Sequence, residues 1–109
     1  MGEHQHEREL PFVSVIMPIR NEEEFIADSL GAVLAQDYPP DRMEVLIADG
    51  MSTDATRDII AKTAAAHPEI SVSVLDNPRE IVPTAFNIAL AQARGEVIVR
   101  VDGHTIIAP

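Results

Sequence analysis

Short apolar runs alternate along the chain with longer segments in which apolar residues recur every three or four positions. The short runs are rich in Val and Ile and contain neither Gly nor Pro, which is typical of buried strands. The spacing in the longer segments predicts amphipathic helices. The predicted strands cover residues 12–17, 44–48, 71–75 and 97–101, and the predicted helices cover 21–36, 54–66 and 83–94.

Residues with special backbone preferences mark the ends of these elements. Pro18 cannot donate a hydrogen bond to a sheet, so the first strand should end there. Asn21 is a favourable N-cap, and Glu24 completes a capping-box pattern three residues later, so the first helix should begin at Asn21. Pro83 suits the first turn of the third helix, and Gly95 should follow its C-cap.

Alternation of four strands with three helices predicts an α/β fold, with a mainly parallel sheet between helices in a three-layer αβα arrangement. In such sheets ligands gather beyond the carboxyl ends of the strands. These ends are polar in this sequence, at residues 18–21, 49–54, 76–79 and 102–104. We therefore expect the functional site at this edge of the sheet.

Composition narrows the possible functions. The 109 residues include 18 Asp and Glu against 8 Lys and Arg, for a formal net charge of −10, and no cysteine. Such acidity argues against a large nucleic-acid surface, which needs clustered basic residues. The lack of cysteine excludes disulfide frameworks and thiolate nucleophiles. An anionic ligand would need local compensation by backbone N–H groups, isolated arginines or a metal cation.

The two ends of the chain differ in character. Residues 1–11 are polar and predict a flexible tail without the features of a secretory leader, whereas residues 12–109 fit one domain. Polar residues interrupt every apolar stretch well before the roughly 18 residues that a membrane-spanning helix needs. We therefore expect that no segment of this chain crosses a bilayer.

Several common sites are excluded by missing motifs. The chain contains no dinucleotide-binding G-x-G-x-x-G after its first strand, no P-loop and no serine-hydrolase elbow. Asp102 and His104 are two residues apart on an extended segment, so they can face one cation together. Oxygen and imidazole ligands suit Mn²⁺, Mg²⁺ or Zn²⁺. A bound diphosphate would supply the remaining oxygen ligands.

The motifs at the strand ends resemble those of the family 2 glycosyltransferases, which have the GT-A fold with a Rossmann-like nucleotide-binding half. The similarity is greatest to bacterial exopolysaccharide enzymes of the succinoglycan type, in which the metal motif is Asp-Gly-His. The resemblance extends over about residues 12–106 and implies that the chain is the N-terminal, donor-binding half of such an enzyme. The matching segments are Ser14–Asn21 with the glutamates after it, Ala48–Asp54, Asn87 in Thr-Ala-Phe-Asn, Ala93–Ile98, and the Asp-Gly-His at 102–104.

The resemblance implies a role for individual residues. Pro18, Ile19 and Arg20 would line the nucleotide pocket, mostly through their backbone. Asp49 would hydrogen-bond the base or the ribose. Arg79, in the loop after the third strand, would approach the uracil or the diphosphate.

The metal motif has its own implied roles. Asp102 would contact both the ribose and the metal ion, which would be Mn²⁺ or Mg²⁺. His104 stands where the family usually has a second aspartate that binds the cation. The substitution lowers the negative charge of the metal site by one.

The resemblance also implies what the chain acts with. The donor would be a nucleotide-diphospho-sugar, a UDP-sugar in preference to a GDP-sugar. The acceptor would be a glycan or a lipid-linked acceptor in polysaccharide or glycolipid synthesis. An inverting transfer needs a catalytic base, which is expected beyond Pro109. We therefore expect residues 12–109 alone to turn over little or no substrate. A cytoplasmic location is expected, with the inner face of the membrane open as a site for a longer protein.

Less specific interpretations stay open beside this one. Glu22 to Glu24 suit a helix-dipole cap better than catalysis, and Arg100 suits a structural ion pair. A phosphoacceptor signalling domain also has acidic strand ends, but it needs a lysine beyond a late strand, and Lys62 is in the middle of a predicted helix. A sugar nucleotidyltransferase would need a glycine-rich, lysine-bearing loop after the first strand, where this chain has Pro-Ile-Arg-Asn.

Overall fold

A parallel four-stranded sheet forms the centre of the protein, and the computed structural model describes residues 10–103. The strand order is β3-β2-β1-β4. The elements, in chain order, are β1 (Val13–Ile19), α2 (Ile26–Leu34), the 3₁₀ turn η1 (Pro40–Arg42), β2 (Met43–Asp49), α3 (Thr56–Ala65), β3 (Ser71–Asp76), α4 (Val82–Gln92) and β4 (Val97–Arg100).

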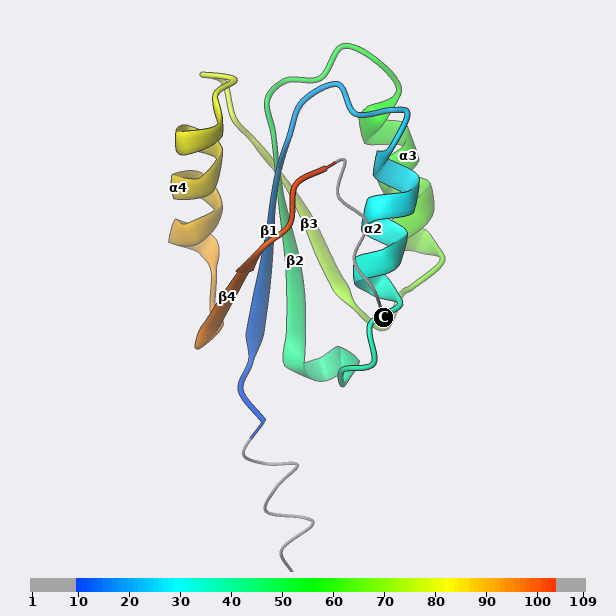
Figure 1. Cartoon of the computed structure of the whole chain (residues 1–109), viewed down its shortest axis with the longest axis vertical. Coiled ribbons are helices and arrows are strands. Elements are labelled where there is room, and N and C mark those ends of the chain that lie inside the picture. The colour runs from blue at the N-terminus through cyan, green and yellow to red at the C-terminus, as the bar shows by residue number, and fades with distance from the viewer. Residues whose placement is uncertain (1–9, 104–109) are drawn as a thin grey trace, which may run out of the picture.

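The helices cover opposite faces of the sheet. Helices α2 and α3 lie on one face and α4 lies on the other, which gives the three layers expected from the sequence (Figure 1). The chain moves outward from β1 to β2 and β3, then returns across the sheet through α4 to place β4 on the other side of β1. The direction of strand addition therefore reverses at β1 and β4, and ligands of open parallel sheets bind beside such a reversal.

The two faces carry cores of different size. The core beneath α2 and α3 contains thirteen buried residues, among them Met17, Leu30 and Ile60, whereas the core beneath α4 contains five, among them Ile16 and Ala89. Every residue of β2 is buried, because this central strand is covered on both faces. Continuous burial explains why its sequence is apolar in a nearly unbroken run.

Strand β1 continues past Pro18 to Ile19, so the predicted end at Pro18 is wrong. The Ile19 carbonyl accepts a hydrogen bond from Gly50 of the β2 side, and the Ile16 carbonyl accepts one from Val101 of the β4 side. Backbone groups alternate between the two neighbours along β1, which directs position 18 toward β4. The pairing of β4 ends at Ile16–Arg100, since Pro18 has no N–H with which to continue it.

The predicted capping box at Asn21 is also wrong. Helix α2 begins at Ile26 and has no side-chain cap. Asn21 has a φ of 51° in the left-handed region, and its side chain accepts a hydrogen bond from the Thr53 backbone N–H at 2.8 Å. A contact between loops more than thirty residues apart in the sequence has taken the place of a local cap.

Gly95 does not directly follow the C-cap of α4, as was predicted, since the C-cap is Ala93. Helix α4 stops at Gln92, and none of the described glycines has a positive φ. A Cβ at Gly95 would instead lie 2.6 Å from the backbone nitrogen and the hydroxyl of Ser14. The glycine is thus needed for close approach to β1. Pro83 does lie in the first turn of α4, as predicted.

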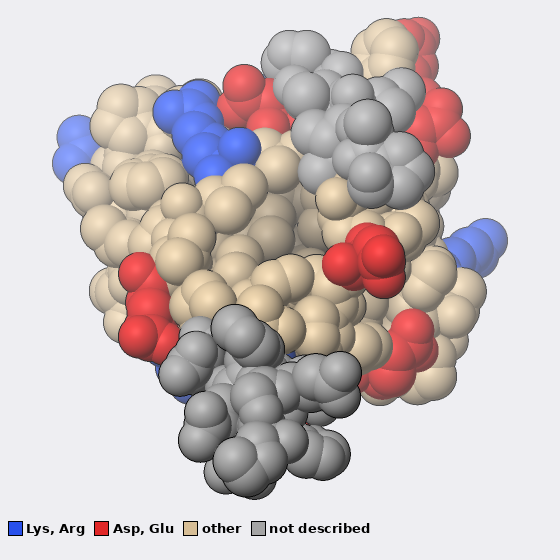
Figure 2. Space-filling view, turned by 60° about the horizontal axis from the view of Figure 1, so that its bottom comes forward, with Lys and Arg blue, Asp and Glu red and all other residues tan. Residues whose placement is uncertain are grey.

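Charge and apolar length complete the description of residues 10–103. On the face turned forward in Figure 2, acidic side chains are spread apart rather than gathered in one cluster. None of the described helices is both long enough and apolar enough to cross a membrane.

Candidate functional site

A pocket of about 320 Å³ opens where the strand order reverses, at the carboxyl ends of β1 and β4 and the first turn of α4. One part of its lining is apolar and the other carries three carboxylates and two guanidinium groups. The lining residues are Pro18, Ile19, Arg20, Glu22, Asn77, Glu80, Ile81, Val82, Ala85, Arg100, Asp102 and Gly103. An apolar wall beside charged groups suits a ligand with a ring and an anionic part.

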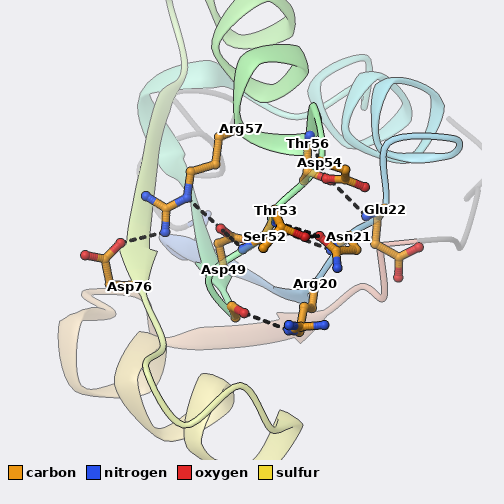
Figure 3. A network of polar contacts seen from close by, with 11 residues as sticks. Arg20, Asn21, Glu22, Asp49, Ser52, Thr53, Asp54, Thr56, Arg57 and Asp76 are labelled. Atoms are coloured by element: carbon orange, nitrogen blue, oxygen red, sulfur yellow. Dashed lines mark hydrogen bonds and ion pairs between the residues drawn. The ribbon is translucent and has the colours of Figure 1, made fainter.

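Arg20, just after β1, connects the segments that follow β2 and β3. Its Nε donates to the Gly50 carbonyl at 2.9 Å, and its Nη2 lies 3.0 Å from an oxygen of Glu80. Figure 3 shows the Arg20 side chain beside the end of β2. A Cβ at Gly50 would be 3.2 Å from both the Arg20 side chain and the Glu80 Cα, so the absence of a side chain at position 50 lets the loops meet.

Arg100 and Asp102 form a second ion pair at the pocket. The Nε and Nη2 atoms of Arg100 lie 3.2 and 3.1 Å from the same oxygen of Asp102, and both side chains are about half exposed. The next residue, Gly103, accepts a hydrogen bond from the buried Ser29 hydroxyl of α2 at 2.6 Å. This bond anchors the segment that carries Asp102. We call Arg20–Glu80 and Arg100–Asp102 the pocket pairs.

Asp49 belongs to a different group, formed with Ser52, Arg57 and Asp76. We call it the buried network because its central carboxylate, Asp49, is fully covered, whereas Arg57 and Asp76 are 41% and 62% exposed. The Asp49 side chain is 0% exposed, and its carboxylate accepts hydrogen bonds from the Ser52 hydroxyl and backbone and from Arg57 Nε at 2.6 Å. The other arm of Arg57 reaches Asp76 at 2.6 Å (Figure 3). Hydrogen bonds to Asp76 and Asp49 raise the pKa of Arg57 above its ordinary value, so it stays charged.

Hydrogen bonds between the loop after β1 and the loop after β2 support both the pocket pairs and the buried network. The Asn21 backbone donates to the Ser52 hydroxyl at 2.8 Å, and the Glu22 backbone donates to the Thr56 hydroxyl at 2.9 Å (Figure 3). The Ala55 backbone donates to the Glu23 carboxylate at 2.9 Å. The loop after β1 is thereby fixed to the loop after β2. These bonds therefore also hold the segment that carries Arg20.

Some of the site residues predicted from the sequence line the pocket and others do not. Pro18, Ile19, Arg20 and Asp102 all line the pocket, and their implied contacts with the nucleotide and the metal stay predictions. Asp49 does not line it, and a ligand contact there would require exchange of its bonds with Ser52 and Arg57, so this role stays a prediction. Arg79 is likewise not among the lining residues, and His104 lies outside the described residues.

Sequence reasoning missed Glu80 and underrated Arg100. Glu80 lines the pocket in place of its neighbour Arg79, because a positive φ of 66° turns the backbone at this position. No motif in a single sequence marks such a turn. Arg100 forms the structural ion pair expected from the sequence, but its partner is Asp102 and the pair lies in the pocket.

Asp102 fits a hard divalent cation in its chemistry and its place. Its carboxylate reaches the pocket, and only one of its oxygens is engaged by Arg100. Carboxylate oxygens are ligands that Mg²⁺ and Mn²⁺ favour. Within residues 10–103, no group of three His, Asp or Glu side chains is placed to hold a metal ion. A bound cation would therefore need ligands from elsewhere, including the bound substrate.

Known proteins resemble this chain in sequence and in fold. The family model for glycosyl transferase family 2 matches residues 14–109. The chain belongs to this family. It is 37% identical over 92 residues to the succinoglycan biosynthesis protein ExoA of Rhizobium meliloti, covering 83% of this chain and 27% of ExoA.

Solved structures of family relatives confirm the parallel α/β fold of the GT-A type. The mannosyltransferase PcManGT of Pyrobaculum calidifontis, in complex with GDP-Man and Mn²⁺, matches 92% of this chain with a TM-score of 0.85 and 34% identity. Staphylococcus aureus TarS 1–349, in complex with UDP-GlcNAc, matches 88% with a TM-score of 0.78 and 31% identity. The chain spans 29% and 27% of these two structures, so it corresponds to less than a third of such proteins.

Proposed function

We propose that residues 12–109 form the donor-binding part of an inverting glycosyltransferase, which binds a nucleotide-diphospho-sugar together with a divalent cation. The observation that carries the proposal is the pocket at the strand reversal, which combines an apolar wall with Asp102 and two arginines. Membership of family 2 and the nucleotide sugars bound by PcManGT and TarS support it.

Charge balance explains why a cation belongs in this pocket. Three carboxylates and two guanidinium groups leave the lining with no surplus of positive charge for a diphosphate. Two unit charges of the same sign about 4 Å apart repel by roughly 4 kcal/mol at an effective dielectric constant near 20. A divalent ion held by Asp102 would offset this repulsion.

Asp102 and His104 are the residues that would hold the ion, which is Mn²⁺ or Mg²⁺. When bound, the ion would stabilise the negative charge that develops on the departing nucleotide. Arg100 competes with the ion for the Asp102 carboxylate, because it already occupies one oxygen. Release of Arg100 on metal binding would leave its guanidinium available to the diphosphate.

The remaining parts of the proposal follow from the family resemblance. The donor is a UDP-sugar in preference to a GDP-sugar, and the acceptor is a glycan or a lipid-linked acceptor. The base that activates the acceptor hydroxyl comes from beyond Pro109, so the 109-residue chain binds donor but turns over little. The site of action is the cytoplasm, with the inner face of the membrane open for a longer protein.

The signalling alternative has less support in the structure. A phosphoacceptor domain needs a lysine at the acidic edge of the sheet, and the sequence has a single lysine, Lys62. It lies in the last turn of α3, away from the carboxyl ends of the strands where the helix begins. We therefore favour the transferase.

Calorimetric titration of the chain with UDP tests the proposal. UDP should bind in the presence of Mn²⁺ or Mg²⁺ and lose most of its affinity in EDTA. Asp102→Ala should abolish this dependence on metal, whereas Asp58→Ala, which removes an exposed carboxylate of α3, should preserve it. Equal affinity with and without EDTA in the unaltered chain would contradict the proposed function.

A further inference from the structure

The Arg20–Glu80 pair has a geometry that a surface ion pair does not require. Exposed pairs contribute little to stability, and these side chains are 42% and 46% exposed. Yet Arg20 is also held by the Gly50 carbonyl at 2.9 Å, and Glu80 has a φ of 66°, which is strained for a residue with a side chain. Three loops are thus arranged to hold this pair in the wall of the pocket.

Bonds within the β3–α4 loop fix the position of Glu80. Its backbone N–H donates to the Asn77 carbonyl at 3.0 Å. The Asn77 side chain is buried, donates to the Ile81 carbonyl at 2.9 Å and accepts from the Thr84 hydroxyl at 2.8 Å. Glu80 is therefore carried by a braced turn at the start of α4.

The apolar part of the wall lies next to this pair. Ile81 and Val82 follow Glu80 directly and are nearly half exposed, and Pro18 and Ala85 line the same pocket. Exposed aliphatic side chains at the mouth of a pocket suit the face of a flat ring. A nucleobase packed there would have its polar edge near Arg20 and Glu80.

We propose that Glu80 and Arg20 recognise the edge of the nucleobase and select bases in which a ring N–H lies beside a carbonyl. Arg20 donates to the carbonyl oxygen, and the Glu80 carboxylate accepts from the N–H. Uracil and guanine present this edge. Cytosine and adenine present a ring nitrogen acceptor beside an amino group, which places acceptor against acceptor at Glu80. Phosphate is disfavoured at this position because Glu80 repels it.

This inference rests on the proposed nucleotide-binding function and makes Glu80 a specificity-determining residue. UDP and CDP are the matched probes, since they differ only along the base edge in question. Titration of the ¹⁵N-labelled chain, followed by amide chemical shifts with Mg²⁺ present, measures both affinities. UDP should bind about tenfold more tightly than CDP, the lower end expected for a hydrogen bond to a charged group in a half-exposed site.

Variants assign the discrimination to its residue. Glu80→Gln should weaken UDP about tenfold and bring the UDP and CDP affinities within about threefold of each other, because an amide can present either a donor or an acceptor. Glu69→Gln, the same change at an exposed position after α3, should leave both affinities unchanged. Glu80→Asp, which keeps the charge with a shorter reach, should weaken UDP while keeping part of the preference, and circular dichroism verifies that each variant is folded.

The outcomes separate the two proposals. Metal-dependent binding of UDP and CDP with equal affinity would overturn the role of Glu80 and leave the proposed function standing. A preference for UDP that survives in Glu80→Gln would also overturn it. Failure of both nucleotides to bind would overturn the proposed function and the inference together.

Discussion

Two sets of ion pairs lie at the same edge of the sheet and differ in the burial of their strand-end aspartate, Asp49 in one and Asp102 in the other. In the buried network, Asp49 is fully covered and bonded to Ser52 and Arg57, and no atom of it borders the pocket. In the pocket pairs, all four side chains are 42% to 49% exposed and all four line the pocket. The comparison teaches that an aspartate at a strand end is structural or functional according to what covers it.

The position of each strand explains this difference. The residues that follow β2 fold back over its end, where Ser52 and Arg57 bond the Asp49 carboxylate. Strands β1 and β4 lie where the direction of strand addition reverses, so the helices after β1 and before β4 cover opposite faces. Their ends are left uncovered, and the pocket forms there.

Removal of the buried carboxylate should have the largest effect on stability. Asp49→Ala leaves Arg57 without its buried partner and Ser52 without its acceptor, so the free energy of unfolding should fall by about 3 kcal/mol. Asp76 is the other partner of Arg57 and its side chain is 62% exposed. Asp76→Ala should therefore lower the free energy of unfolding by less than about 1 kcal/mol. Urea denaturation of the two variants measures both values. Equal losses would contradict the claim that the buried carboxylate contributes more to stability than the exposed one.

Glu44 extends the comparison to the opposite end of the sheet, far from the pocket. It is buried and accepts hydrogen bonds from the Ser14 hydroxyl at 2.7 Å and from the Arg94 backbone at 2.8 Å. Burial raises the pKa of Glu44, but the hydrogen bonds from Arg94 and Ser14 outweigh it and leave the pKa below its ordinary value. The charged form is therefore favoured in the folded protein.

This lowered pKa predicts the pH dependence of a variant. Glu44→Gln should cost about 1 to 2 kcal/mol of unfolding free energy at pH 7. A carboxyl with a lowered folded-state pKa stabilises above its unfolded pKa and loses that contribution as the pH falls through the folded value. The difference from the unaltered chain should therefore shrink below about pH 4. Denaturation at pH 7 and pH 3 measures it, and a difference that grows on acidification would contradict the assignment.

Gly50 joins the two sets, since it follows Asp49 and contacts the Arg20–Glu80 pair. Gly50→Ala places a methyl group 3.2 Å from the Glu80 backbone and from the flexible Arg20 stem, so the loops must shift by a few tenths of an ångström. We expect a loss of about 0.5 to 1 kcal/mol in stability and a loss of UDP affinity by a few fold. Thermal unfolding and titration measure the two, and unchanged UDP affinity would show that the position of Arg20 has no part in binding.

The sequence predicted the general architecture because it depends on local periodicity. The order of strands and helices, the parallel sheet and the polar edge were all present in the spacing of apolar residues, as in the unbroken apolar run of β2. The role of Asn21, by contrast, is set by its hydrogen bonds with Ser52 and Thr53, and the need for glycine at position 95 is set by the close approach of Ser14. Such long-range contacts leave no mark in local spacing.

The sequence predicted at which edge of the sheet the pocket lies, but only some of the residues that line it. Asp49 and Asp102 look alike in the sequence, since each follows an apolar strand. They differ in the structure because Ser52 and Arg57, which are three and eight residues after Asp49, fold back over Asp49 and bond its carboxylate. Glu80 and Arg79 were indistinguishable until the left-handed backbone at Glu80 showed which of the two borders the pocket.

The most direct test of the central claim, that the pocket pairs and not the buried network mark the donor site, is the location of bound metal. Small amounts of Mn²⁺ added to the ¹⁵N-labelled chain with UDP broaden the amide signals nearest to the ion. We predict the strongest broadening at Asp102, Gly103 and Glu22, and weaker broadening at Arg57 and Asp76. Strongest broadening at Arg57 and Asp76 would contradict the account.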